Sequence, residues 1–313
     1  MEKYDFLILG SGITGLKLAS DLRKKGFTTL NLDRSMDLGY PVSGSCFISL
    51  KAYNDFFSPY EKYTGGIFSS IIIEMENSEE EISLASERKI VTMDREKLVR
   101  KMASELSEDG GTIHIASIIR GFREESEGTV RVSVVTEGKE NLLEAGKIIL
   151  ATSNVDTDLL KHGRECIKGF TGSLYSRGTV VKSPEEKFSV SLKEGGIRVE
   201  AIYLGKREIL EINQVSSKVS NMESIFKYST VNHSCFPETE SFIYVSGNML
   251  GTKNYLGTGL EYSIKFNNHM IENIDRSDLV PKLKEKFRVM NLEKDFSSMD
   301  PVDSILYRIP IFS

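Results

Sequence analysis

The sequence predicts an α/β fold in which a parallel central sheet and a β-meander are joined to a smaller antiparallel β-rich domain. The chain opens with a buried-strand pattern, a glycine turn, an amphipathic helix pattern and a second strand, the order of a βαβ unit. Its middle instead alternates apolar and polar residues between turn residues, which is typical of antiparallel strands. With 313 residues, 40% of them hydrophobic, the chain can bury a core of this size.

The opening unit has the most regular pattern. The apolar run from Phe6 to Leu9 predicts a strand that is buried on both faces. Residues 28–32 predict a second strand that ends at Asp33. Between them lies a helix that ends at Gly26 and whose apolar residues recur at helical spacing: Leu16, Ala19 and Leu22.

Residues 36–93 are irregular, with an apolar stretch "GIFSSIIIEM" before the acidic run "ENSEEE". The acidic run predicts a solvated turn between two strands of a smaller sheet. A helix follows in "TMDREKLVRKMASELSEDGG", where Asp94 is a candidate N-cap and glycines end the helix. Its apolar face is formed by Leu98, Val99, Met102, Ala103 and Leu106.

The next segments predict a three-stranded meander: "TIHIASIIRGF", "TVRVSVVTEG" and "ENLLEAG". The run "KIILATS" predicts a further strand of the central sheet, "SFIYVSGN" its last core strand, and residues 260–274 a long helix. We predict a discontinuous first domain at residues 1–157 and 240–275, a β-rich substrate or cap domain at 158–239, and a C-terminal helix and tail at 276–313. Residues 36–93 belong to the first domain only in part, because they also contribute to the second.

Composition narrows the function classes. A net charge of −5 argues against a nucleic-acid surface, which needs excess Lys and Arg. Cys46, Cys166 and Cys235 are too far apart for a disulfide framework or a zinc ribbon, and "NHSC" offers no second ligand pair, so we expect no metal. The start of the chain lacks a signal-peptide pattern and no apolar stretch reaches about 18 residues, which predicts a cytoplasmic protein.

The chain end is apolar: "DSILYRIPIF". The simplest interpretation is a tail docked on its own domain. The other hypotheses are a lid over a hydrophobic substrate, a dimer contact or a peripheral contact with a membrane surface. The sequence does not fix the oligomeric state.

A glycine motif at the first turn predicts dinucleotide binding. Gly10, Gly12 and Gly15 form GxGxxG directly after a strand and open a helix. In this pattern the first glycine permits the tight turn, the second the approach of a pyrophosphate, and the third close helix–strand packing. Asp33 stands where a carboxylate binds a ribose 2′-hydroxyl; it disfavours a 2′-phosphate, although Arg34 could offset the repulsion. The motif favours FAD or NAD over NADP, and the meander and β-rich middle that follow favour FAD.

A second glycine-rich stretch, "VSGNMLGTKNYLGTGLEY", precedes the predicted helix at 260–274. With the first fingerprint and "MDREKLVRKMASEL", it makes the chain resemble the FAD-dependent geranylgeranyl reductase family, within the wider aromatic-hydroxylase-like flavoproteins. The resemblance covers roughly residues 1–155 and 240–275. It implies a Rossmann-like FAD-binding domain and an oxidoreductase that moves hydride or electrons between flavin and a small hydrophobic substrate, with an isoprenoid as the suggested class.

The resemblance also implies site residues. The first loop would hold the pyrophosphate, Asp33 the adenosine ribose, and Arg95 would lie near the ribose–phosphate region, although "DREKL" also fits a plain capped helix start. Gly257 and Gly259 would direct a helix N-terminus, which carries partial positive charge, at the flavin. The cofactor contacts expected are Gly10, Ser11, Gly12, Ile13, Thr14, Gly15, Asp33, Arg34, Arg95, Gly247, Asn248, Gly251, Gly257, Thr258, Gly259 and Leu260.

The reaction is less defined than the cofactor. Cys46 is the one catalytic candidate, and a buried apolar thiol is its simpler interpretation. The family's ribityl-binding Asp is Asn248 here, which can accept a hydrogen bond but brings no charge. "IILATSNVDTDLL" is similar to the amine-oxidase and protoporphyrinogen-oxidase branch, so an FAD oxidase that consumes oxygen is one alternative. The other is a non-catalytic binding protein with an eroded cofactor site, like the GDP-dissociation inhibitors of small GTPases.

Overall fold

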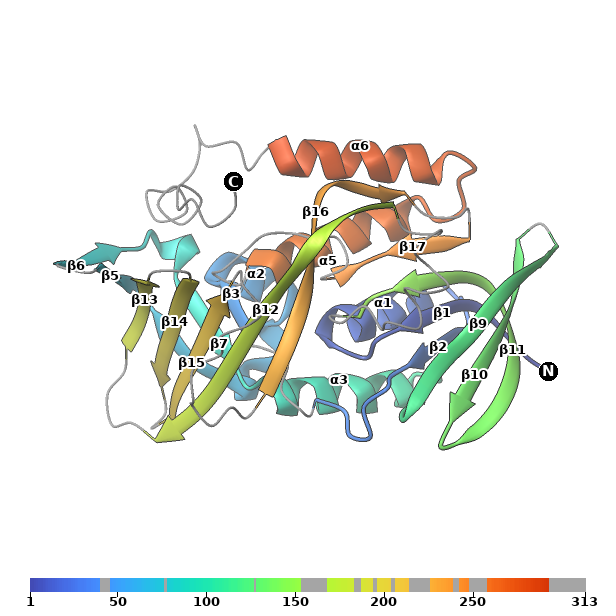
Figure 1. Ribbon diagram of the computed structural model, residues 1–313, viewed down its shortest axis with the longest axis horizontal. Coiled ribbons are helices and arrows are strands. Elements are labelled where there is room, and N and C mark those ends of the chain that lie inside the picture. The colour runs from blue at the N-terminus through green and yellow to red at the C-terminus, as the bar shows by residue number, and fades with distance from the viewer. Residues whose placement is uncertain are drawn as a thin grey trace.

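A computed structural model gives the fold of the 313-residue chain (Figure 1). The structure describes residues 1–39, 46–75, 78–126, 128–152, 168–182, 187–193, 196–203, 206–213, 226–238, 242–247 and 258–292.

The first sheet has a parallel centre. Strand β1 lies between β2 and β11 and is parallel to both; β8 extends the sheet beyond β2, and β17 pairs in parallel with the end of β11. The strands are β1 (Glu2–Leu9), β2 (Thr29–Leu32), β8 (Thr112–His114), β11 (Lys139–Leu150) and β17 (Ile243–Val245).

The β-meander continues from the same sheet. Strands β9 (Ser117–Ser126) and β10 (Thr129–Thr136) pair antiparallel with each other, and β10 pairs antiparallel with the first half of β11. The prediction of a parallel sheet with a meander and a separate antiparallel sheet is confirmed.

Two strand boundaries were predicted wrongly. "TIHIASIIRGF" is two strands, because Ala116 has a φ of +48°, a left-handed conformation that ends β8 before β9 begins. "ENLLEAG" and "KIIL" are one strand, β11, whose first half pairs with the meander and whose end pairs with β17. Near the changeover a Cβ on Gly146 would lie 2.9 Å from the carbonyl oxygen of Asp5, so glycine lets β1 and β11 approach.

Four helices pack side by side in the order α3, α1, α5, α6 (Figure 1). They are α1 (Ile13–Lys24), α3 (Arg95–Glu108), α5 (Thr258–Glu272) and α6 (Leu279–Leu292). The apolar stripe predicted for α3 is buried, and the Asp94 carboxylate caps that helix by accepting from the Lys97 N–H at 3.2 Å.

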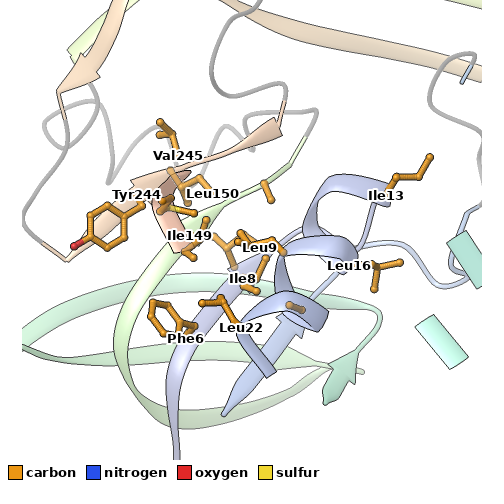
Figure 2. Close-up of a cluster of buried hydrophobic side chains, with 14 of the residues drawn as sticks. Phe6, Ile8, Leu9, Ile13, Leu16, Leu22, Ile149, Leu150, Tyr244 and Val245 are labelled. Carbon is orange, nitrogen blue, oxygen red and sulfur yellow. The ribbon is translucent and has the colours of Figure 1, made fainter. Parts of the chain in front are cut away.

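The core lies between the parallel sheet and these helices. Figure 2 shows apolar side chains from β1, α1, β11 and β17 gathered in one cluster. Members from β1 and α1 are almost inaccessible, with Ile8 at 0% and Leu16 at 1% exposure. Burial of this apolar surface holds the loop after β1 in a fixed position, since both elements that flank the loop are anchored.

A second sheet has the strand order β16-β12-β15-β14-β13-β5-β6 and is antiparallel except where β13 meets β5. Its strands are β5 (Ser70–Met75), β6 (Ser78–Ser83), β12 (Lys168–Lys182), β13 (Lys187–Lys193), β14 (Gly196–Tyr203), β15 (Lys206–Asn213) and β16 (Phe226–Glu238). The acidic run was predicted to be a turn between two strands of a smaller sheet. Strands β5 and β6 do pair antiparallel, but Glu79 to Glu81 belong to β6 and not to a turn, while residues 76–77 lie outside the described residues. Among the described strands, β6 pairs with β5 alone. Charged side chains suit such an edge strand because they oppose pairing with another chain.

A three-stranded sheet, β3-β7-β4, completes the described strands, and three short helical elements lie close to it in the sequence. The bounds are β3 (Cys46–Ser49), β4 (Thr64–Phe68), β7 (Ile90–Met93), α2 (Leu50–Phe56), η1 (Ser58–Tyr63) and η2 (Ser86–Arg88).

One buried polar residue in the central sheet gives a stability prediction. Asn31 on β2 is 0% exposed, and neither its Oδ1 nor its Nδ2 has a hydrogen-bond partner among the described residues. An unsatisfied buried amide costs about 1–3 kcal/mol. We expect Asn31→Leu, which has a similar shape, to raise the free energy of unfolding by about that amount. Urea denaturation measures it, and a lower urea midpoint would contradict the prediction.

Candidate functional site

The first glycine loop joins the end of β1 to α1. The Gly10 N–H donates to the carbonyl of Leu32 at 2.8 Å, and the Ala151 N–H donates to the carbonyl of Leu9 at 2.8 Å. These bonds tie the loop to the ends of β2 and β11. The loop therefore lies at the carboxyl edge of the parallel sheet, where ligands bind in open α/β folds.

The three glycines of the motif differ in what requires them. Gly10 has a φ of +109°, and a Cβ there would lie 2.7 Å from the Ala151 carbonyl oxygen; at Gly15 a Cβ would lie 2.1 Å from the Gly10 carbonyl oxygen. Gly12 has an ordinary extended backbone, φ −74° and ψ 175°. Around its Cβ position the closest atom is Nη2 of Arg95, at 3.7 Å, an ordinary van der Waals distance. Packing explains Gly10 and Gly15 but not Gly12.

The N-terminus of α1 has features of an anion site. Gly12 is its N-cap and offers no side-chain hydrogen bond, and the first turn contains no acidic residue. The first N–H groups of a helix lack intrahelical partners and carry partial positive charge. Ser11, 2% exposed, adds a buried hydroxyl oxygen with no partner among the described residues. This loop can therefore accept an anionic group close to the backbone.

Arg95 brings a cation to the same loop. It is the first residue of α3, and its guanidinium nitrogen is the atom nearest to the Cβ position of Gly12. The two sequence interpretations of "DREKL" are thus compatible, because Asp94 caps the helix while Arg95 reaches the glycine loop.

Asp33 links three strand ends. Its Oδ2 accepts the Ser11 N–H at 2.7 Å and its Oδ1 accepts the Ser35 N–H at 2.9 Å. Its own N–H donates to the carbonyl of His114 at 2.9 Å. An ionised carboxylate has about four acceptor positions, so the two bonds leave capacity for ribose hydroxyls. Arg34, beside it, is exposed.

The two glycine-rich stretches meet, although they are more than 200 residues apart in the sequence. Gly247 follows β17 with a φ of +60°, and its Cβ position is 3.6 Å from Cβ of Thr14 and 3.7 Å from the Ala151 carbonyl oxygen. Thr258, Gly259 and Leu260 form the first turn of α5. The predicted contacts Asn248, Gly251 and Gly257 lie outside the described residues.

Two polar contacts near this region were missed from the sequence. The Ser49 hydroxyl, which caps α2, also donates to Glu261 Oε2 at 2.9 Å, and Glu261 pairs with Lys265. The Ser246 hydroxyl donates to Asn267 Oδ1 at 2.7 Å, and both residues are buried. Each contact joins segments distant in the sequence, and no local pattern signals such a pairing.

The structure adds little about Cys46, the one catalytic candidate. Cys46 pairs with Met93 in the β3–β7 ladder, while its side chain lies outside the described part.

Burial and a 2.6 Å hydrogen bond to Glu105 raise the pKa of Tyr60. Glu105 is ten residues after Arg95 on α3, which is about 15 Å along a helix, so this pair is a structural contact rather than part of the glycine site.

Within the part of the chain that the structure describes, no group of three His, Cys, Asp or Glu could hold a metal ion. No helix there is long and apolar enough to cross a membrane.

Solved structures share this architecture, whereas no protein-family model matches the sequence. A geranylgeranyl bacteriochlorophyll reductase-like protein from Thermoplasma acidophilum matches with a TM-score of 0.73 and 15% identity, over 94% of this chain and 84% of that chain. A flavoprotein/dehydrogenase from Cytophaga hutchinsonii gives 0.69 and 11%, over 97% and 90%. A p-nitrophenol 4-monooxygenase from Pseudomonas putida gives 0.73 and 11%, over 98% and 94%.

These matches confirm, at the level of the fold, the resemblance predicted from the sequence. The chain shares its Rossmann-like α/β fold with a reductase-like protein, a flavoprotein/dehydrogenase and a monooxygenase. One fold can host several reactions, so the similarity does not choose among them.

Proposed function

We propose that this protein binds FAD and is a flavin-dependent oxidoreductase that acts on a small hydrophobic substrate, of which an isoprenoid is the class suggested by the reductase-like neighbour. The observation that carries the proposal is Gly12. The described residues leave room for a side chain there, so the glycine is explained by a ligand that approaches the backbone.

The surrounding residues supply what a dinucleotide requires. The uncapped N-terminus of α1 and the guanidinium of Arg95 stabilise the negative charge of a pyrophosphate. The carboxylate of Asp33 can accept hydrogen bonds from ribose hydroxyls at its remaining acceptor positions, and its charge repels a 2′-phosphate. Gly247, next to Thr14, leaves space where the second glycine-rich stretch begins.

In this proposal the FAD domain is formed by residues 1–157 and 240–275, and the sheet of β12 to β16 covers the substrate. When bound, the flavin supplies the hydride or electron chemistry. The chain orients the cofactor, excludes water and presents the N-terminus of α5, whose partial positive charge stabilises negative charge nearby.

The visible absorption spectrum of the purified protein, with and without added FAD, tests the proposal. We expect either a flavin spectrum on purification or saturable uptake of FAD by the apoprotein. A preparation that neither contains nor takes up flavin would contradict the proposal. The alternative would then be a non-catalytic binding protein, which Asn248 in place of an Asp favours. If flavin binds, oxygen uptake and peroxide formation by the reduced protein distinguish an oxidase from a reductase.

Arg95→Ala should weaken FAD binding without unfolding the protein. Arg95 is half-buried beside Gly12, and a charge-assisted hydrogen bond contributes about 1.5–3 kcal/mol. We therefore expect the Kd for FAD, measured by fluorescence titration, to rise about 10–100-fold.

Arg288→Ala is the matched control, because it removes the same side chain from an exposed ion pair with Glu285 on α6. Its Kd should equal that of the unaltered protein. Equal affinity of all three proteins would show that Arg95 does not contact the cofactor.

A further inference from the structure

A buried hydrogen bond joins the start of the second glycine-rich stretch to the middle of α5. Ser246, the residue after β17, is 0% exposed and Asn267 is 1% exposed. The Ser246 hydroxyl donates to Asn267 Oδ1 at 2.7 Å, and the Ser246 N–H donates to the carbonyl of Leu150 at 2.8 Å. Ser246 is thus held from α5 on one side and from β11 on the other.

Most buried residues near this pair in the sequence are apolar, although Ser263, one turn before Asn267 on α5, is buried as well. On α5 the neighbours in sequence, Ile264, Phe266 and Met270, are all 0% exposed, and Val245 precedes Ser246 at 1%. Asn267 Nδ2 has no hydrogen-bond partner among the described residues. A hydrogen bond with an unused buried donor adds little to stability, because replacing both partners by apolar groups of similar shape is close to neutral. Stability therefore does not account for the pair.

The position of the Ser246–Asn267 pair next to Gly247 explains it better. Gly247 directly follows Ser246, adopts a φ of +60°, and lies beside Thr14 in the first turn of α1, just after the first glycine loop. A directional bond at Ser246 fixes where this turn sits relative to α5 and α1, which apolar contacts alone do not specify.

We propose that Asn267 is a positioning residue for the dinucleotide: through Ser246 it holds the Gly247 turn against the first glycine loop in the geometry that the cofactor requires. The inference rests on the proposed function, since it concerns the same site. Asn267 does not itself contact the cofactor in this scheme; it acts through Ser246.

The test compares stability with affinity in the full-length protein. In the double variant Ser246→Ala/Asn267→Leu, we expect the urea midpoint of the ligand-free protein to stay the same or rise. The Kd for FAD should increase at least about tenfold, the effect of losing one well-placed interaction. Met270→Leu, a buried change of similar volume one turn further along α5, should leave the Kd unchanged.

Each other outcome overturns the inference. An unchanged Kd in a stable double variant would show that the turn does not depend on the pair. A fall in the urea midpoint that accompanies the loss of affinity would make the pair an ordinary structural contact. If the unaltered protein takes up no FAD at all, the proposed function itself is wrong, which this design separates from failure of the inference alone.

Discussion

The Gly12→Ala variant should fold with nearly normal stability and fail to bind FAD tightly. Within the described part of the chain, the new methyl group would meet only the flexible end of Arg95, at 3.7 Å, and Gly12 already has a backbone conformation open to any residue. Alanine is a poor N-cap, so we expect a loss of at most about 1 kcal/mol in the free energy of unfolding.

The effect on binding should be far larger. A methyl group on Gly12 would occupy the space through which a pyrophosphate reaches the first N–H groups of α1. Loss of several charge-assisted hydrogen bonds, each worth about 1.5–3 kcal/mol, predicts a rise in Kd of at least about 100-fold. Fluorescence titration with FAD and urea denaturation of the same preparation measure the two quantities.

This pair of measurements separates the competing functions. A binding protein with an eroded cofactor site would have no use for a bare backbone at position 12, so its partner binding and stability would both survive the substitution. Normal FAD affinity in a folded Gly12→Ala protein would mean that the cofactor does not approach this loop.

The sequence predicted the first unit of the fold well because its signals are local. An apolar strand, a glycine turn and a helical stripe lie within about 25 residues, and each depends on its own backbone geometry. The cap at Asp94 is local too, and the structure confirms it.

Strand pairing was harder to predict, because paired strands are often far apart in the sequence. The sequence of β11 gives no sign that its first half pairs antiparallel with β10 and its last residues in parallel with β17. The acidic run of β6 has a loop-like composition, and only its position at the edge of a sheet makes a strand acceptable.

The same distinction applies within the site. The motif predicted a different role for each glycine, but the atoms that crowd Gly10 and Gly15 come from the tertiary fold and could not be identified from the sequence. Proximity of Arg95 to Gly12 and of Gly247 to Thr14 likewise required the packing of α3 and β17. The sequence-based assignment of FAD contacts stays a prediction at every position.

Gly15→Ala should be the most destabilising change in the motif. Its Cβ would lie 2.1 Å from the Gly10 carbonyl oxygen and 3.2 Å from the Gly10 carbonyl carbon, both backbone atoms. Gly10 cannot retreat, because its N–H is bonded to Leu32 and its own Cβ position is 2.7 Å from the Ala151 carbonyl oxygen. Helix α1 must therefore move away from β1 and give up part of the core packing.

We expect Gly15→Ala to lower the free energy of unfolding by about 3 kcal/mol, at the upper end of the usual cost of overpacking. Urea denaturation of the ligand-free protein measures it. Gly121→Ala on β9 is the control, since none of the described residues has an atom within 4 Å of that Cβ position, and it should be neutral or stabilising by up to about 1 kcal/mol. If both variants were equally stable, β1 and α1 could not be as close as the structure places them. A stable Gly15→Ala protein without FAD affinity would instead transfer to Gly15 the ligand-facing role assigned here to Gly12.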